Sequence, residues 1–199
     1  MQNPKVVKPN FFLIGAGKSG TTSMAAQLAQ HPAVFVTTPK EPHYFSFNHG
    51  RGQAWYYGLF REGARCASRG EASVTYSQRS LWPGVAERIH SELGPDCRFI
   101  YIVRHPVRAL ESHIFHDKSR GHIELDAEVS SLISNDSDYV SARRYFYQIS
   151  DYIRVFGSER VLIVAFEDFI TSPNVVCAEV GLIAIRKSMI QVQGMSVSG

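Results

Sequence analysis

Apolar residues along this chain gather in short runs, and most of these runs end at a turn. Three of them are strongly apolar: FFLIG at 11–15, RFIYIV at 98–103 and RVLIVAF at 160–166. Runs of this length, rich in β-branched and aromatic residues, are typical of strands buried on both faces. Weaker runs at 33–36 and 70–74 predict two shorter strands.

The segments between these runs have patterns that favour helices or loops. We expect helices that glycine or proline brings to an end, over 22–30, 54–60, 84–93, 106–118 and 138–156, and a last one that starts near Pro173. Polar stretches at 37–51 and 119–137 are predicted to be loops, the second with at most a short helix. Alternating strands and helices predict an α/β fold with a central parallel sheet flanked by helices, and ligands at the carboxyl ends of the strands.

The composition is that of one ordinary globular domain. Of the 199 residues, 44% are hydrophobic and 20% are charged, and the formal net charge is +3. This mild positive charge suits an anionic ligand but is far below that of nucleic-acid-binding proteins, so no nucleic-acid partner is expected. The three cysteines lack the spacing of a metal site and are predicted to be reduced thiols.

The sequence also bears on location. No apolar run approaches the about 18 residues that a membrane span needs. The first ten residues, MQNPKVVKPN, lack the hydrophobic region of a secretory signal. We therefore expect a cytoplasmic protein with no membrane span, and nothing in the sequence indicates its oligomeric state.

The first apolar run continues into the glycine-rich segment GAGKSGTTS at 15–23. A buried strand, a glycine-rich turn and a helix start together form an anion site, because unpaired N–H groups and the helix dipole both favour negative charge. The residue order differs from the nucleotide-triphosphate loop G-x-x-x-x-G-K-[ST]. Thr21 follows Gly20, and the lysine lies two residues earlier at Lys18. The segment can hold a phosphate without the usual magnesium arrangement; an ordinary strand–turn–helix connection is the alternative.

The second apolar run ends in Arg104, where a magnesium-dependent P-loop enzyme would have a carboxylate. Arginine instead offers a planar, permanently charged fork for a phosphate. Ser112 lies eight residues further on, about two helical turns away. The two side chains are therefore candidates to bind one phosphate without a metal ion. The alternative is that Arg104 pairs with a surface carboxylate.

Taken together, KSGTTS at 18–23 and YIVRHPVRALESH at 101–113 resemble the 3′-phosphoadenosine 5′-phosphosulfate (PAPS)-dependent sulfotransferases, most of all the heparan-sulfate and carbohydrate type. The resemblance implies a three-layer, P-loop-like fold and PAPS as donor co-substrate, with no metal. It implies that Lys18 is catalytic and stabilises charge on the leaving phosphosulfate bridge. It further implies that the donor binds Lys18, Ser19, Gly20, Thr21, Thr22 and Ser23 through its 5′-phosphosulfate, and Arg104 and Ser112 through its 3′-phosphate.

The loop segment TTPKEPHYFSF at 37–47 resembles the K-E-x-x-F-F stretch of the glycosaminoglycan-modifying members. This resemblance assigns Glu41 as the catalytic general base, with His43 as its orienter or as an alternative base. The alternative is that both residues only shape a loop rich in proline and aromatic residues.

A third segment, RGEASVTYSQR at 69–79, has Ala72 where family members often have lysine. Glu71 is therefore predicted to be structural or to face the substrate, rather than to act as a base. Tyr76 and Arg79 are candidates for the acceptor cleft or for the surface.

The segment at 143–169 also resembles the family, through its helix, its strand and the Glu-Asp pair that follows. Tyr145 is a plausible neighbour of the donor site. Glu167 and Asp168 are expected to cap and orient the next helix.

The resemblance covers residues 11–180, so we expect a sulfotransferase domain over 1–180 that is incomplete at its C-terminus, and an atypical tail over 181–199. Family members usually continue with a glycine- and lysine-containing loop that closes over the nucleotide. The predicted function is in-line, metal-independent transfer of a sulfuryl group from PAPS to a hydroxyl or amine of a small-molecule or, more specifically, carbohydrate acceptor. The alternatives are a non-catalytic nucleotide-binding remnant and a variant P-loop kinase or NTPase.

Overall fold

A computed structural model describes residues 6–134 and 137–178 of the chain. Its strands form one five-stranded parallel sheet in the order β2-β3-β1-β4-β5. The strands are β1 (Phe11–Gly15), β2 (Val34–Val36), β3 (Ser68–Ala72), β4 (Arg98–Val103) and β5 (Val161–Ala165). The predicted α/β class and parallel sheet are confirmed, and the strand bounds agree with the sequence prediction to within two residues.

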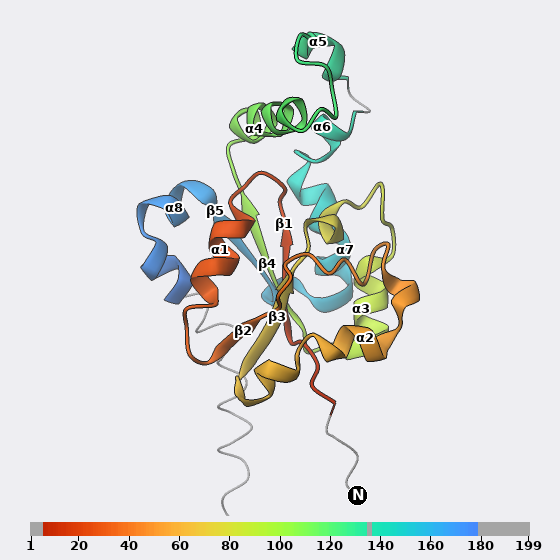
Figure 1. Cartoon of the computed structure of the whole chain (residues 1–199), viewed down its shortest axis with the longest axis vertical. Helices are drawn as coiled ribbons and strands as arrows, with labels where there is room; N and C mark the ends of the chain where they lie inside the picture. The colour runs from red at the N-terminus through yellow and green to blue at the C-terminus, as the bar shows by residue number, and fades with distance from the viewer. Residues whose placement is uncertain (1–5, 135–136, 179–199) are drawn as a thin grey trace, which may run out of the picture.

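Eight helices in the described residues connect or follow the strands (Figure 1). They are α1 (Thr21–Leu28), α2 (Gln53–Gly58), α3 (Val85–Leu93), α4 (Pro106–Ser119), α5 (Val129–Leu132), α6 (Asp138–Ser141), α7 (Tyr145–Phe156) and α8 (Phe166–Thr171). Residues 173–178 are helical as well, as expected from Pro173. The predicted tail at 181–199 lies outside the described residues. No helix among those described is both long and apolar enough to cross a membrane.

The two faces of the sheet carry separate halves of the core, because successive strand side chains point to opposite faces. Phe12 and Phe99 pack on the face that α2, α3 and α7 cover. Phe11 and Ile100 pack on the other face, under α1 and α8. The sheet is therefore the middle of three layers, as predicted.

The site is placed by the strand order. Connections from β1 lead first to β3 and β2 on one side, whereas β4 and β5 lie on the other. Ligands of parallel α/β sheets bind where the strand order reverses, outside the carboxyl ends of the strands. In this chain the segments that follow β1 and β4 meet at that point, and α4 and α6 stand beyond it (Figure 1).

The structure corrects two of the sequence predictions. The expected helix over 138–156 is two helices, because the chain turns between α6 and α7 and Arg144 adopts a non-helical conformation with ψ of 64°. The run at 160–166 does form a strand, but it is not fully buried: Ile163 is 52% exposed. β5 is an edge strand that pairs only with β4 among the described strands, so its apolar run is incompletely covered.

Candidate active site

The turn between β1 and α1 contains backbone N–H groups that have no backbone acceptor among the described residues. Lys18 and Gly20 both have left-handed backbone conformations, with φ of 65° and 85°. Within the described chain, no backbone carbonyl accepts the N–H groups of Gly17, Lys18 or Gly20. The first-turn N–H groups of α1 also lack partners within the helix, as at any helix start. N–H groups without backbone acceptors at a helix start are suited to bind an anion.

Besides its backbone conformation, a close contact also requires glycine at position 20. A Cβ atom at this position would lie 2.7 Å from the ring of Phe166, the first residue of α8. The guanidinium carbon of Arg104 lies 4.7 Å from the centroid of the same ring. Phe166 therefore connects the glycine-rich turn to the arginine that follows β4, although no sequence signal identified it.

Arg104 lies against the glycine-rich turn. Its Nη1 donates a long hydrogen bond of 3.4 Å to the carbonyl of Lys18. Its own carbonyl accepts a 2.8 Å hydrogen bond from the hydroxyl of Tyr145, which fits the prediction that Tyr145 neighbours the donor site. The described contacts of the guanidinium are a ring face and a carbonyl rather than a carboxylate. Most of its donor fork is thus available to a ligand.

A cavity of about 520 Å³ opens beside the turn, at the carboxyl ends of β1 and β3. Five of the predicted site residues line it, namely Lys18, Gly20, Thr21, Thr22 and Glu41. The other predicted residues do not. Ser19 is fully buried and Ser23 is exposed on α1, while His43, Arg104 and the half-buried Ser112 lie outside the lining.

Glu41 and His43 form a compact pair in the loop after β2. Both have positive φ values, 63° and 53°, which are unusual for residues other than glycine. Glu41 Oε1 pairs with Lys40, and Glu41 Oε2 lies 3.3 Å from His43 Nε2. The other ring nitrogen, Nδ1, lies 2.8 Å from Thr75 Oγ1. Both ring nitrogens of His43 are thus engaged, which favours the orienting role over that of an alternative base.

Different causes lower the pKa values of Lys18 and Glu41, the two predicted catalytic residues that line the cavity. Burial lowers the pKa of Lys18, with Arg120 and Arg143 adding to the effect and Asp117 and Glu41 opposing it. Burial alone would raise the pKa of Glu41, but the hydrogen bonds and charges of its two neighbours in the loop lower it to about 2. The lysine can therefore release its proton more readily than usual, while the glutamate is ionised at neutral pH.

Residues 8–181 match the model of the sulfotransferase domain. The chain belongs to the sulfotransferase domain family. Its fold is similar to that of a sulfotransferase from Alicyclobacillus acidocaldarius, with a TM-score of 0.79 and 29% identity over 90% of this chain and 81% of that one. The mouse sulfotransferase SULT7A1 complexed with PAP shares the fold, with a TM-score of 0.55 and 15% identity over 96% of this chain and 60% of that one.

Two curated relatives match about half of this chain. The mouse heparan sulfate glucosamine 3-O-sulfotransferase 6 is 33% identical over 53% of this chain and 30% of its own length. The membrane-associated sulfotransferase kil1 of Dictyostelium discoideum is 32% identical over 54% of this chain and 23% of its own. The matched part of the chain thus spans less than a third of either relative.

Glu71 of the sulfotransferase domain is structural, one of the two roles that the sequence left open. Its side chain is fully buried and accepts hydrogen bonds from the hydroxyls of Tyr56, Ser73 and Tyr76, at 2.5, 2.6 and 2.8 Å. Burial raises the pKa of this carboxyl, although the three hydrogen bonds oppose that shift. Ser73 Oγ also accepts the N–H of His43 at 3.1 Å, so the buried network supports the loop that carries Glu41.

The expectation for Tyr76 was wrong, because at 2% exposure it belongs neither to a cleft nor to the surface. It is a core residue whose ring packs on Phe12 and Phe45. Arg79 does lie near the surface, where its Nε pairs with Asp151 at 2.7 Å.

Replacing Glu71 with alanine is expected to lower the free energy of unfolding by about 2–5 kcal/mol, because three buried hydroxyls would lose their common acceptor. Urea denaturation would measure the change. The control is Glu62→Ala, which removes an exposed carboxylate from the 3-10 helix Arg61–Arg65. Equal stability of the two variants would contradict the structural role of Glu71.

The cavity residues that the sequence analysis missed include five titratable side chains, which come from α4, from the residue that follows it and from the turn after α6. Four of these, His113, His116, Asp117 and Arg120, follow the spacing i, i+3, i+4 and i+7, and all line the cavity. The first three lie on α4, and Arg120 is its C-cap residue. This polar stripe was visible in the sequence, since such spacing places side chains on one helix face. The fifth residue, Arg143, had no local signal, because the break between α6 and α7 positions it.

Arg143 links the glycine-rich turn to α4. Its Nη1 donates to the carbonyl of Gly17 at 3.0 Å, and its Nη2 lies 3.1 Å from Nδ1 of His113. Because a guanidinium can only donate, Nδ1 accepts and the ring is neutral, with its proton on Nε2. Burial lowers the pKa of His113; Arg143 adds to this effect and Asp117 opposes it.

Glu167 and Asp168 lie in the first turn of α8, where acidic side chains favour the helix dipole. No side-chain cap bond is formed at this helix start, contrary to the expectation of capping. Glu167 Oε1 instead accepts the N–H of His105, the residue before α4, at 3.1 Å. This bond connects the start of α8 to the start of α4, next to Arg104 in the sequence.

Proposed function

We propose that this sulfotransferase domain transfers a sulfuryl group from PAPS to a hydroxyl or amine of an acceptor, and that the acceptor is a carbohydrate. The observation that carries the proposal is that one cavity is lined by an anion-binding turn, by a lysine in that turn and by a glutamate across from it. PAPS supplies the sulfuryl group and leaves as adenosine 3′,5′-bisphosphate.

The residues of the turn fit an anionic donor. Lys18, Thr21 and Thr22 line the cavity beside the free N–H groups. Ser19 does not line the cavity, but its hydroxyl is buried within the turn and has no hydrogen-bond partner among the described residues. A buried hydroxyl without a partner is costly, and a bound phosphosulfate is a suitable acceptor for groups in this turn. We assign Lys18 to Ser23 to the 5′-phosphosulfate.

Arg104 and Ser112 are assigned to the 3′-phosphate. The guanidinium of Arg104 keeps most of its donors free and is oriented by the ring of Phe166. Ser112 lies two turns into α4, the helix that begins just after Arg104. Arginine binds phosphate through two parallel hydrogen bonds, which gives both affinity and orientation. Recognition of this phosphate would distinguish PAPS from ATP.

The chemical step uses the groups that line the cavity. Lys18 stabilises negative charge on the bridging oxygen as the bond from sulfur to that oxygen breaks. Glu41 takes the proton of the acceptor hydroxyl or amine, whose oxygen or nitrogen forms the new bond to sulfur. His43 holds the Glu41 carboxylate through Nε2. We propose transfer without a metal ion, because an arginine occupies the place after β4 where a magnesium-binding carboxylate would stand.

Selective stabilisation by adenosine 3′,5′-bisphosphate tests the donor assignment. We expect this ligand to raise the Tm of the chain more than ATP–Mg does, by the equivalent of about 2.7 kcal/mol at a hundredfold excess over Kd. Arg104→Ala should remove the preference. The control Arg108→Ala alters an exposed arginine on α4, paired with Glu111, and should retain the preference.

Each other result has a defined meaning. Equal stabilisation by both nucleotides would contradict the assignment of Arg104 to the 3′-phosphate. Stabilisation by ATP–Mg alone would favour the variant kinase or NTPase. Bisphosphate binding with no transfer to any acceptor would favour the non-catalytic alternative.

A further inference from the structure

A second, smaller cavity adjoins the cavity beside the glycine-rich turn, on the side of α6. Its volume is about 230 Å³. It shares with the larger cavity the residues Gln78, His113, Asp117, Ala142 and Gln148. The remainder of its lining comes from Ser80, Leu81, Asp138, Tyr139 and Ser141. Because the two cavities share a wall, a ligand group in the smaller one would be adjacent to the reacting groups.

The two cavities differ in charge. Four cationic side chains line the larger one, which are Lys18, Lys40, Arg120 and Arg143. The described lining of the smaller cavity has no lysine or arginine but contains the carboxylates of Asp117 and Asp138. His113, which belongs to both, is neutral in the observed arrangement because it accepts a hydrogen bond from Arg143.

The carboxylate of Asp117 is held in place and ionised. Its Oδ2 accepts a 2.8 Å hydrogen bond from the hydroxyl of Tyr139, and the rings of His113 and His122 lie at 3.6 and 3.5 Å from its two oxygens. Burial would raise the pKa of Asp117, but these hydrogen bonds and the nearby histidines lower it. The acidic wall is thus a fixed feature of the fold.

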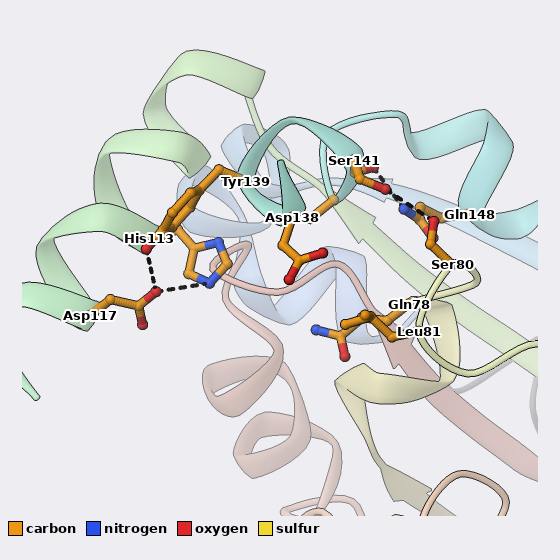
Figure 2. A pocket seen from close by; sticks show the side chains of 10 residues that line it. Gln78, Ser80, Leu81, His113, Asp117, Asp138, Tyr139, Ser141 and Gln148 are labelled. Carbon is orange, nitrogen blue, oxygen red and sulfur yellow. Dashed lines mark hydrogen bonds and ion pairs between the residues drawn. The ribbon is translucent and has the colours of Figure 1, made fainter. Parts of the chain in front are cut away.

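Asp138 supplies the second carboxylate. Figure 2 shows its side chain directed into the cavity, between Tyr139 and Gln78. No described residue forms a side-chain hydrogen bond or ion pair with Asp138 or with the amide of Gln78 that faces it. Both side chains therefore keep their full hydrogen-bonding capacity for a ligand. Leu81 and the ring of Tyr139 add apolar surface to the same space.

We propose that the smaller cavity binds a sugar ring of the acceptor that carries hydroxyl or ammonium groups and no negative charge. This inference rests on the proposed function and names the acceptor class for that site. Carboxylates and an amide accept and donate hydrogen bonds to hydroxyls, and the apolar surface suits the carbon face of a ring. A carboxylate or sulfate on the ring would meet the carboxylates of Asp117 and Asp138 in a lining that has no lysine or arginine among the described residues, and such like-charge contacts are costly.

The volume and position agree with this assignment. The cavity is smaller than the about 300–1,000 Å³ typical of drug-sized ligand sites, which limits it to about one ring. Because the two cavities share five lining residues, a ring in the smaller one lies next to the larger cavity, which Glu41 lines. The smaller cavity thus selects the acceptor by charge, while the larger one carries out the transfer.

Acceptor competition tests the inference. The probes are chitobiose, its fully deacetylated diamine and a disaccharide with a terminal glucuronic acid, each supplied with PAPS and, for binding, with adenosine 3′,5′-bisphosphate. We expect kcat/KM for the neutral or amino sugar to exceed that for the acidic sugar by at least about tenfold. Asp138→Asn should reduce this ratio about 3–10-fold, mainly through KM, with kcat retained. Asp126→Asn, which removes an exposed carboxylate outside both cavities, should not change it.

The results separate this inference from the proposed function. Equal use of the acidic sugar, or an unchanged ratio in Asp138→Asn, overturns the acceptor assignment. Binding of the bisphosphate with neither binding nor sulfation of the neutral and amino sugars also overturns it. If the bisphosphate itself does not bind, the proposed function fails. A merely structural role of Asp138 would change stability but not the ratio between acceptors of different charge.

Discussion

Lys18→Ala is expected to reduce kcat for sulfuryl transfer by about 10²–10³-fold, with the fold retained. The reduction follows because the ammonium group is the charged donor placed in the anion-binding turn, and loss of one such donor to a developing negative charge has an effect of this size. Lys18 lines the cavity, and the turn holds its backbone in a left-handed conformation. Transfer of radiolabelled sulfuryl from PAPS at saturating acceptor would measure kcat.

Two comparisons make this test specific. Lys8→Ala removes an exposed lysine that lies over the ring of Tyr57, far from the turn, and should leave kcat unchanged. Because burial lowers the pKa of Lys18, we also expect activity to fall, as the pH rises, at a lower pH than an ordinary lysine would cause. This alkaline loss should be delayed in Lys18→Arg, because arginine stays protonated. An unchanged kcat in Lys18→Ala would refute the catalytic role.

Glu41→Gln is expected to lower kcat by about 10²–10⁴-fold while binding of adenosine 3′,5′-bisphosphate is kept, because the substitution removes the proton acceptor but not the turn that binds the donor. Steady-state transfer and the ligand-induced rise in Tm would be measured on the same preparations. Glu111→Gln, which alters an exposed carboxylate on α4, is the matched control. A variant with parental kcat would leave Glu41 with the loop-shaping role alone.

The pH dependence of Glu41 has a defined sign. Its pKa is lowered to about 2, below the ordinary value of 4.5, so the carboxylate is ionised throughout the neutral range. It contributes stability that is present above about pH 4.5 and lost as the pH falls toward 2. Glu41→Gln should therefore flatten the fall in unfolding free energy between pH 5 and 3. We expect the anionic donor to raise the pKa of Glu41 on binding, which would make it a stronger base.

Much of the fold could be predicted from the chain because its signals are local. The buried strands are short apolar runs, and Gly94, Gly157 and Pro106 mark helix ends or starts where the structure has them. The edge position of β5 was not predictable in this way, since an apolar run has the same composition whether one or two strands flank it. Strand order depends on contacts between distant segments, which no local pattern records.

The candidate site was predicted only in part for the same reason. Sequence comparison of motifs identified the turn around Lys18, the loop of Glu41 and the residues that follow β4. It gave no sign of Arg143, which reaches the carbonyl of Gly17 across 126 positions. No local pattern indicated Phe166 either, because its contacts with Gly20 and Arg104 join segments that are far apart in the sequence.

The sequence by itself determined the glycine-rich turn that carries Lys18, the arginine that follows β4 where a magnesium ligand would stand, and the family. These features depend on residue order over a few positions, where backbone geometry and side-chain chemistry suffice. The tertiary structure alone decided that Glu71 is a buried structural residue rather than a substrate contact, and that Nε2 of His43 contacts the Glu41 carboxylate. It also decided the charge division between the two cavities, because α4 and α6 come together only when the chain folds.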